Sequence, residues 1–186
     1  MTDLVSLKYN PIQGNNITLR KLLLSDINET YCSWLNDPDT NRYLEARLIN
    51  WDIEKLRHHY LINDDIDILM AIIDNKKNKH IGNLKLSAID EIHRRAELGI
   101  LIGDKDYWGK GVATEAINLA TNYCFSKLEL HKVTAGAYKE NLGSIKAFLK
   151  NGYCIEGERK EHFLMSYGWT SLILLGKLKT HDTSTN

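Results

Sequence analysis

The alternation of apolar and polar residues predicts a sheet at the centre of the chain. Residues 81–89 alternate, which is typical of a strand with one buried face. Apolar runs lie on either side, at 66–73 and 96–102, and polar turn segments separate all three. We therefore expect these strands to be neighbours in an antiparallel meander. Further strands are expected at residues 17–22, 132–138, 153–155 and 172–178.

Helical spacing predicts four helices around this sheet. In the clearest one, apolar residues recur three and four positions apart along a single face. The first helix is expected to begin after a cap at Ser25-Asp26 and to stop before Pro38, because the residue before a proline avoids helical geometry. The four helices are expected at residues 27–36, 50–61, 112–127 and 141–150.

The order of these elements indicates the fold class. The chain is expected to form a single α+β domain over residues 1–186, with a mostly antiparallel central sheet of about 6–7 strands flanked by about four helices. Residues 1–15 are expected to be a loose leader or an edge strand, and residues 156–168 a mobile hairpin. Residues 180–186 are expected to be a disordered polar tail.

The composition excludes several classes of protein. Of 186 residues, 43% are apolar, and no run approaches the roughly 18 apolar residues that a membrane-spanning helix needs. Lys plus Arg and Asp plus Glu both number 24, so the basic excess of a nucleic-acid binder is missing. Three isolated cysteines and the lack of a signal-peptide pattern indicate a reducing, cytoplasmic location. The histidine spacing matches no metal motif, so no metal is expected.

A glycine loop joins the last of the central strands to the longest helix. The loop reads Gly109-Lys110-Gly111, and glycine lets backbone approach a ligand closely. The first amides of the following helix have no partner inside the helix, and the helix dipole adds partial positive charge there. A strand, a glycine loop and a helix N-terminus together predict an anion site, which we interpret as a cradle for a pyrophosphate.

Other interpretations of the loop fit its residues less well. A P-loop, G-x-x-x-x-G-K-[ST], needs closer glycines than Gly103 and Gly109, and it needs Ser or Thr where Gly111 stands. A dinucleotide fingerprint, G-x-G-x-x-G, finds two of its glycines, but Thr114 replaces the third. That fingerprint usually opens its domain, whereas about 95 residues precede it here. A purely structural glycine turn is the remaining alternative.

The segment 108–113, W-G-K-G-V-A, resembles the acyl-CoA loop of the GCN5-related N-acetyltransferase (GNAT) superfamily, [QR]-x-x-G-x-[GA]. Trp108 departs from the first position of that motif. This departure and the W-x-N-D stretch from Trp34 to Asp37 are similar to the RimJ/RimL-like branch of the superfamily. The resemblance implies an N-acetyltransferase that moves the acetyl group of acetyl-CoA to a primary amine by direct attack in a ternary complex.

The same resemblance implies the partners of the chain. Acetyl-CoA would be the co-substrate, without a metal. The acceptor would be a protein N-terminus of the ribosomal-protein type, an amino sugar or another small amine. No nucleic acid or membrane is implied as a partner, and the chain would be a monomer or a homodimer.

The resemblance also implies which residues bind acetyl-CoA. Amides at the helix start would hold the pyrophosphate, and the strand before the loop would lie along the pantetheine arm. A second family motif, from Val133 to Tyr153, implies that Asn141 contacts the cofactor, although Asn141 also suits a helix N-cap. The implied cofactor-binding residues are Ile100, Leu101, Ile102, Gly109, Lys110, Gly111, Val112, Ala113, Thr114 and Asn141.

The catalytic residues are harder to assign. Many relatives carry a tyrosine seven residues after this asparagine to protonate the departing thiolate, but here Phe148 has no proton to give. The RimL-like branch implies Ser144 as the acid instead, although Ser144 also suits a second helix cap. We choose Glu97, which opens the central strand, as the base, because a carboxylate in a closed cleft accepts a proton more readily. An exposed charge at the strand end is the alternative.

The acceptor side is expected between the first two helices. In the superfamily this region lines the cleft that receives the amine, and Arg47 lies in it as well. A solvated loop with a core tyrosine is the alternative. The substrate-binding candidates are Arg42, Tyr43 and Glu45.

Two other functions stay open from the residues alone. Phe148 is compatible with a non-catalytic acyl-CoA-binding or sensing domain, and Gly109-x-Gly111 with a nicotinamide-dependent oxidoreductase. Release of free CoA in the presence of an amine separates an enzyme from a sensor, and binding of NADH would support the oxidoreductase.

Overall fold

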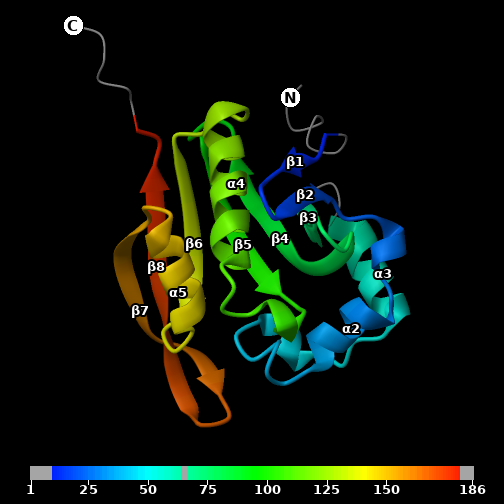
Figure 1. Cartoon of the computed structure of the whole chain (residues 1–186). Helices are drawn as coiled ribbons and strands as arrows, with labels where there is room; N and C mark the ends of the chain where they lie inside the picture. The colour runs from blue at the N-terminus through cyan, green and yellow to red at the C-terminus, as the bar shows by residue number, and fades with distance from the viewer. Residues whose placement is uncertain (1–9, 64–66, 181–186) are drawn as a thin grey trace, which may run out of the picture.

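A single sheet connects most of the chain in the computed structural model, which describes residues 10–63 and 67–180 (Figure 1). Over these residues the sheet has eight strands in the order β1-β2-β3-β4-β5-β6-β8-β7. Only β5 and β6 pair in parallel, and the other neighbours pair antiparallel. The strands are β1 (Ile12–Gln13), β2 (Ile17–Lys21), β3 (Ile68–Asp74), β4 (Lys79–Asp90), β5 (Arg95–Ile102), β6 (Lys132–Tyr138), β7 (Cys154–Met165) and β8 (Gly168–Leu178).

The predicted α+β class and mostly antiparallel sheet are confirmed. The eighth strand is the two-residue β1, which falls inside the predicted leader or edge strand. The rest of that leader, residues 1–9, lies outside the described residues, as do residues 181–186 of the predicted tail and the predicted strand start at residue 66.

Helices cover both faces of the sheet. Helices α4 (Val112–Ser126) and α5 (Leu142–Lys150) share a core with one face, and α4 lies in front of the strands in Figure 1. Helices α2 (Glu29–Asn36) and α3 (Ile53–Asn63) share a second core with the opposite face. Successive strand residues therefore alternate between the two cores, as period-two side-chain geometry requires. Three short 3-10 turns complete the described elements: η1 (Leu24–Asp26), η2 (Glu45–Leu48) and η3 (Lys105–Tyr107).

The predicted cap of the first helix is wrong. The helix begins at Glu29, and Asn28 is its cap, with its side chain accepting from the amide of Tyr31 at 3.2 Å. Asp26 lies in η1 instead, where Arg20 holds its carboxylate through bonds of 2.7 and 2.8 Å. An ion pair from the neighbouring strand therefore takes the carboxylate that local sequence assigns to a cap. Helix α3 also begins three residues later than predicted.

The predicted hairpin at residues 156–168 is confirmed, but the strand that enters it, predicted at residues 153–155, continues to Met165. Strand β7 has 12 residues and pairs with the 11-residue strand β8 up to the turn between Met165 and Gly168. The ladder is interrupted twice by register shifts, and Glu161 there has a positive φ of 48°. Because β7 is an edge strand with mostly exposed residues, it lacks the apolar alternation that sequence analysis detects.

The pairing between β5 and β6 stops early. In the described part of the chain, only three pairs join them, the last being Glu97 with Thr134. Strand β5 nevertheless continues to Ile102 and β6 to Tyr138, and Figure 1 shows the two strands moving apart after their shared start. Their facing backbone groups beyond this point have no partner across the gap, so an extended ligand can pair with them.

Candidate functional site

The glycine loop after β5 has the conformation that an anion cradle requires. Gly109 and Gly111 have φ values of +71° and +82°, in the left-handed region that favours glycine. A Cβ atom built on either residue meets no atom within 4 Å. Packing therefore does not explain these two glycines, whereas backbone conformation and open space for a ligand do.

The start of helix α4 presents unpaired amides to this loop. The helical ladder begins with the amide of Glu115, which donates to the carbonyl of Gly111 at 3.0 Å. The amides of Val112, Ala113 and Thr114 come before that bond, so they have no acceptor within the helix. Together with the helix dipole, they form a site that suits a diphosphate group. The residues present thus fit the pyrophosphate that the sequence predicts.

Trp108, which departs from the family motif, anchors the loop to the sheet. Its indole Nε1 donates to the carbonyl of Ile102, the last residue of β5, at 2.8 Å. One residue earlier, the Tyr107 hydroxyl donates to the Asp74 carboxylate at the end of β3. Two aromatic residues therefore fix the loop against two strands without any contact from Lys110, whose side chain is exposed.

The predicted strand residues lie beside the loop on both faces of β5. Ile100 and Ile102 are half-buried against the core shared with α4, and Leu101 packs against the core shared with α2 and α3. Glu97 lies at the point where the pairing between β5 and β6 ends, and its side chain is exposed. A base in a closed cleft was expected here, but the Glu97 carboxylate is exposed. The role of Glu97 as the base remains a prediction.

Helix α5 places Asn141 and Ser144 together at its start. Asn141 is the N-cap, and its Oδ1 accepts from the Ser144 amide at 3.2 Å. The Ser144 hydroxyl makes no hydrogen bond with the described residues, which leaves it free to donate to a ligand. Phe148, by contrast, is only 1% exposed and packs edge-on against Tyr153 in the core. The position that carries a tyrosine in many relatives is therefore occupied by a core phenylalanine in this chain.

On the other face of the sheet, a polar network joins η2 to the end of β6. The Glu45 carboxylate accepts from Arg47 Nη1 at 2.7 Å and from the hydroxyl of Tyr138. Arg47 also donates to the Tyr138 hydroxyl at 2.8 Å and, from Nη2, to the Leu164 carbonyl of β7 at 3.1 Å. Three segments far apart in the sequence therefore meet at the guanidinium of Arg47.

Aromatic rings surround this network. Tyr138 stacks on Phe163 of β7 with ring centroids 4.3 Å apart, and the ring of Tyr43 lies 5.7 Å from it. The Tyr43 hydroxyl points to the carbonyl of Glu140 at 3.4 Å. The guanidinium of Arg42 lies 5.4 Å above the Tyr43 ring. The structure thus brings the three predicted substrate residues together with the end of β6 and with β7.

The charge on Glu45 follows from these contacts. Burial acts to raise the pKa of its carboxyl, but hydrogen bonds from Tyr138 and Arg47 outweigh burial and lower the pKa. Burial, and then the bond to Glu45, raises the pKa of Tyr138 to about 12. At neutral pH the carboxylate is therefore charged and the phenol protonated. The Glu45 side chain is 57% exposed, so the charge faces solvent.

The sequence prediction omits Tyr138, Phe163 and the Leu164 carbonyl. One signal for Tyr138 exists, because Val133 and Ala135 alternate onto the α4 side and leave Tyr138 on the opposite face. Phe163 has no such signal, since its segment was expected to be a mobile hairpin.

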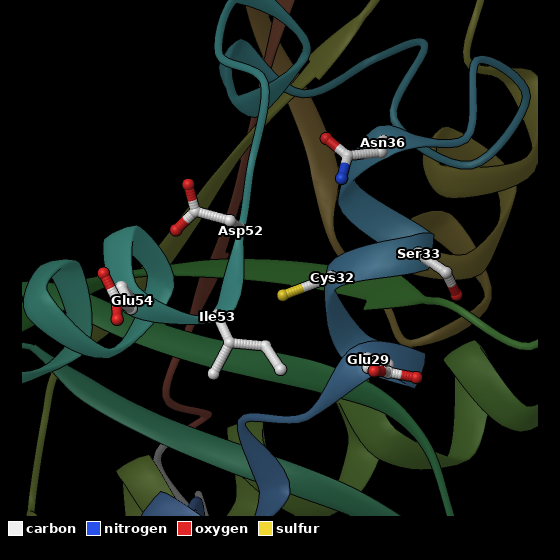
Figure 2. Close-up of a pocket in the computed structure, with 7 residues that line it drawn as sticks. All are labelled: Glu29, Cys32, Ser33, Asn36, Asp52, Ile53 and Glu54. Carbon is white, nitrogen blue, oxygen red and sulfur yellow. The ribbon is translucent and has the colours of Figure 1, made fainter.

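A separate cavity of about 490 Å³ lies between α2 and the start of α3 (Figure 2). Figure 2 shows Cys32 pointing from α2 toward Asp52 and Ile53. Burial raises the pKa of the Cys32 thiol. None of the predicted site residues lines this cavity. Its lining residues are Glu29, Cys32, Ser33, Asn36, Asp52, Ile53 and Glu54.

Residues 10–63 and 67–180 contain neither a metal site nor a membrane-spanning helix. No group of three or more His, Cys, Asp or Glu side chains in these ranges is arranged to hold a metal ion. No helix in the same ranges is long and apolar enough to cross a membrane.

Comparison with known proteins agrees with this geometry. Residues 16–153 match the family model described as Acetyltransferase (GNAT) domain. The uncharacterized N-acetyltransferase p20 of Bacillus licheniformis is 29% identical over 167 residues, which cover 84% of this chain and 92% of that protein. Spermidine N(1)-acetyltransferase of Vibrio cholerae is 30% identical over 154 residues, which cover 82% of this chain and 87% of that protein. The crystal structure of spermidine N-acetyltransferase from Vibrio cholerae in complex with CoA and spermine superimposes with a TM-score of 0.79 at 26% identity, covering 89% of this chain and 96% of that chain.

Proposed function

We propose that this chain, which belongs to the GNAT acetyltransferase family, transfers the acetyl group of acetyl-CoA to a small amine that carries a second, charged amino group. Family membership makes the chain an acetyltransferase with acetyl-CoA as its co-substrate, whereas the acceptor is our proposal. The alternatives of a non-catalytic acyl-CoA-binding domain and of a nicotinamide-dependent oxidoreductase find no support in these matches.

The observation that carries the choice of acceptor is the Glu45 carboxylate. It is charged at neutral pH, faces solvent and lies among aromatic rings at the end of β6. The amine that attacks a thioester must be neutral, so a carboxylate does not help that nitrogen directly. A carboxylate beside aromatic rings does favour an ammonium group elsewhere on the same acceptor. A relative and a solved structure that this chain resembles, both from Vibrio cholerae, are named spermidine acetyltransferases, which supports a polyamine-type acceptor.

The residues of the cofactor side are proposed to have separate roles in the reaction. When bound, acetyl-CoA supplies the acyl thioester. The amides of residues 109–114 and the free edge of β5 are proposed to orient it, and orientation of both reactants supplies much of the rate. The amine nitrogen then attacks the carbonyl carbon, the C–S bond breaks, and the Ser144 hydroxyl passes a proton to the departing thiolate while it takes up another from water. The nitrogen loses its extra proton through water, for which Glu97 is the proposed acceptor.

Release of free CoA, measured with a thiol reagent, tests the proposed function. The panel of acceptors contains a polyamine of the spermidine type, a monoamine of similar length and a short peptide with a free N-terminus. We expect turnover with the polyamine and a much higher KM for the monoamine. Binding of acetyl-CoA without release by any acceptor would overturn the proposal in favour of a binding domain.

The peptide arm of this panel addresses the RimJ/RimL-like branch. In that branch the acceptor is a protein N-terminus, and the resemblance at Trp34 to Asp37 supports it. Turnover with the peptide and none with the polyamine would therefore replace our acceptor by a protein N-terminus. A cytoplasmic location and a monomeric or homodimeric state belong to the same proposal.

A further inference from the structure

We propose that Arg47 and Tyr138 are positioning residues that hold the Glu45 carboxylate toward the acceptor and fasten η2 to the β7–β8 hairpin. This inference rests on the proposed function, because it assigns the task of Glu45 to ammonium recognition. Neither residue needs to touch the acceptor, so their effect is expected in the binding of the amine rather than in the chemical step.

Arg47 is the connection between the segments. Its side chain is only 15% exposed, although a guanidinium is costly to bury without partners. Its partners at the start of η2 are the Leu44 carbonyl at 2.9 Å and the Glu45 carboxylate at 2.7 Å, and its partner on β7 is the Leu164 carbonyl at 3.1 Å. Arg47 also donates to the Tyr138 hydroxyl at 2.8 Å. A guanidinium with this set of acceptors fixes η2 relative to both β6 and β7.

The direction of the bonds explains why a tyrosine stands at position 138. Arg47 has only donors, so the Tyr138 oxygen must accept from it. The single hydroxyl hydrogen of Tyr138 is then committed to the Glu45 carboxylate. Stacking on Phe163 fixes the ring that carries this hydroxyl. The orientation of the Glu45 carboxylate is therefore set from two sides.

The bonds to Glu45 occupy only one of its two oxygens. Both Arg47 and Tyr138 donate to Oε1, and in the described part of the chain no hydrogen bond is made to Oε2. The Glu45 side chain is more than half exposed, and the ring of Tyr138, whose hydroxyl donates to Oε1, lies 5.7 Å from the ring of Tyr43. An ammonium group can reach this oxygen and the aromatic rings together, which matches the second amino group of the proposed acceptor.

The test compares Tyr138→Phe and Arg47→Lys with the wild type in the CoA-release assay. Each variant keeps the size or charge of the residue but loses the bonds that orient Glu45. We expect the KM for the polyamine to rise about 10-fold, as the loss of a hydrogen bond to a charged group predicts. The KM for acetyl-CoA and the kcat at saturating polyamine are expected to stay close to the wild-type values.

Two matched controls separate positioning from general loss of stability. Tyr153→Phe removes a buried tyrosine hydroxyl that is bonded to Thr121 at 2.8 Å, far from Glu45 in the core under α4. Arg20→Lys removes the paired bonds of 2.7 and 2.8 Å to Asp26. Both controls are expected to lower the Tm and to leave the KM for the polyamine unchanged.

A double-mutant cycle shows whether the effect passes through Glu45. In a Glu45→Gln background, Tyr138→Phe is expected to add little to the KM for the polyamine, because the oriented charge is already absent. With the monoamine, which has no second charge, wild type and Tyr138→Phe are expected to have the same KM. Full additivity in the cycle, or the same rise in KM with the monoamine, would overturn the inference.

The outcomes also distinguish the inference from the proposed function. If the wild type acetylates the polyamine but Tyr138→Phe and Arg47→Lys leave the KM for the polyamine unchanged, the inference is overturned and the proposed function stands. A KM that rises equally in the two controls does the same. A wild type that neither acetylates the polyamine nor binds it in a calorimeter with CoA present overturns the proposed function, and the inference with it.

Discussion

Replacing Gly111 by valine separates the cost of a left-handed backbone from the binding of the pyrophosphate. Gly111 has a φ of +82°, and a Cβ there meets no atom within 4 Å, so the substitution causes no clash. Its folding cost is therefore that of the backbone alone, about 1–2 kcal/mol. In a chain of this length we expect a fall in Tm of roughly 2–8 °C.

The effect on acetyl-CoA is expected to be larger than the effect on folding. The valine side chain would occupy the open space in front of the amides of residues 112–114. Loss of one hydrogen bond to a charged phosphate costs about 1.5–3 kcal/mol, which corresponds to a 10- to 150-fold rise in the Kd. Isothermal titration calorimetry with acetyl-CoA measures this Kd, and a thermal melt of the same samples measures the Tm.

Gly168→Val is the matched control. Gly168 has a φ of +117° and equally open surroundings, but it begins β8 at the hairpin turn. We expect this control to lose stability while the Kd for acetyl-CoA stays at the wild-type value. A wild-type Kd in Gly111→Val would refute the assignment of the cradle, and an equal rise in both variants would show that unfolding, not the loop, weakens binding.

Three further variants test other parts of the structure. Glu115→Gln is expected to lower the free energy of unfolding by about 1–2 kcal/mol at neutral pH, because Glu115 accepts from the amide and side chain of Asn16 at 2.8 and 3.0 Å. Burial acts to raise the pKa of this carboxyl but the bonds from Asn16 lower it, so the stabilisation is present above about pH 4.3 and is lost as the pH falls through the lowered pKa; urea unfolding should therefore show the gap closing in acid. Gly103→Ala should lose about 3 kcal/mol in the same assay, because its methyl group would overlap the indole of Trp34. Ser144→Ala should lower kcat about 100-fold with little change in the KM for acetyl-CoA, and an unchanged kcat would remove Ser144 from the mechanism.

The strand, glycine loop and helix from β5 to α4 were predictable because their signals are local. A short apolar strand, two glycines and an amphipathic helix follow one another within residues 98–126, and each signal is a property of neighbouring residues. The positive φ values at Gly109 and Gly111 and the early end of the β5–β6 ladder follow from the same segment and its partner strand. The sequence could not show that Trp108 fastens the loop, since its acceptor is a backbone carbonyl.

The length of strand β7 in its hairpin with β8 was not predictable from pattern. Strand β7 is exposed along most of its length, so its stability comes from the ladder to β8 rather than from an apolar face. Charged residues such as Arg159 and Glu161 are typical of a loop, and the sequence does not show that their strand pairs with β8. The prediction of the α2 cap was wrong for a related reason. Arg20 from β2 binds the Asp26 carboxylate, and only the fold brings these two residues together.

On the proposed acceptor side, the sequence pointed to Arg42, Tyr43 and Glu45 but not to the contacts that orient Glu45. Glu45 stands in a stretch without clear periodicity, and its charge becomes informative only through Arg47 and Tyr138. Tyr138 is 91 residues from Arg47 along the chain, and Leu164 is 117 residues from it. Contacts at such separations leave no trace in local pattern, yet they set the orientation of the carboxylate. The glycine loop, which depends on backbone conformation, is therefore visible in the local sequence, whereas the proposed acceptor network depends on a few side chains in distant segments.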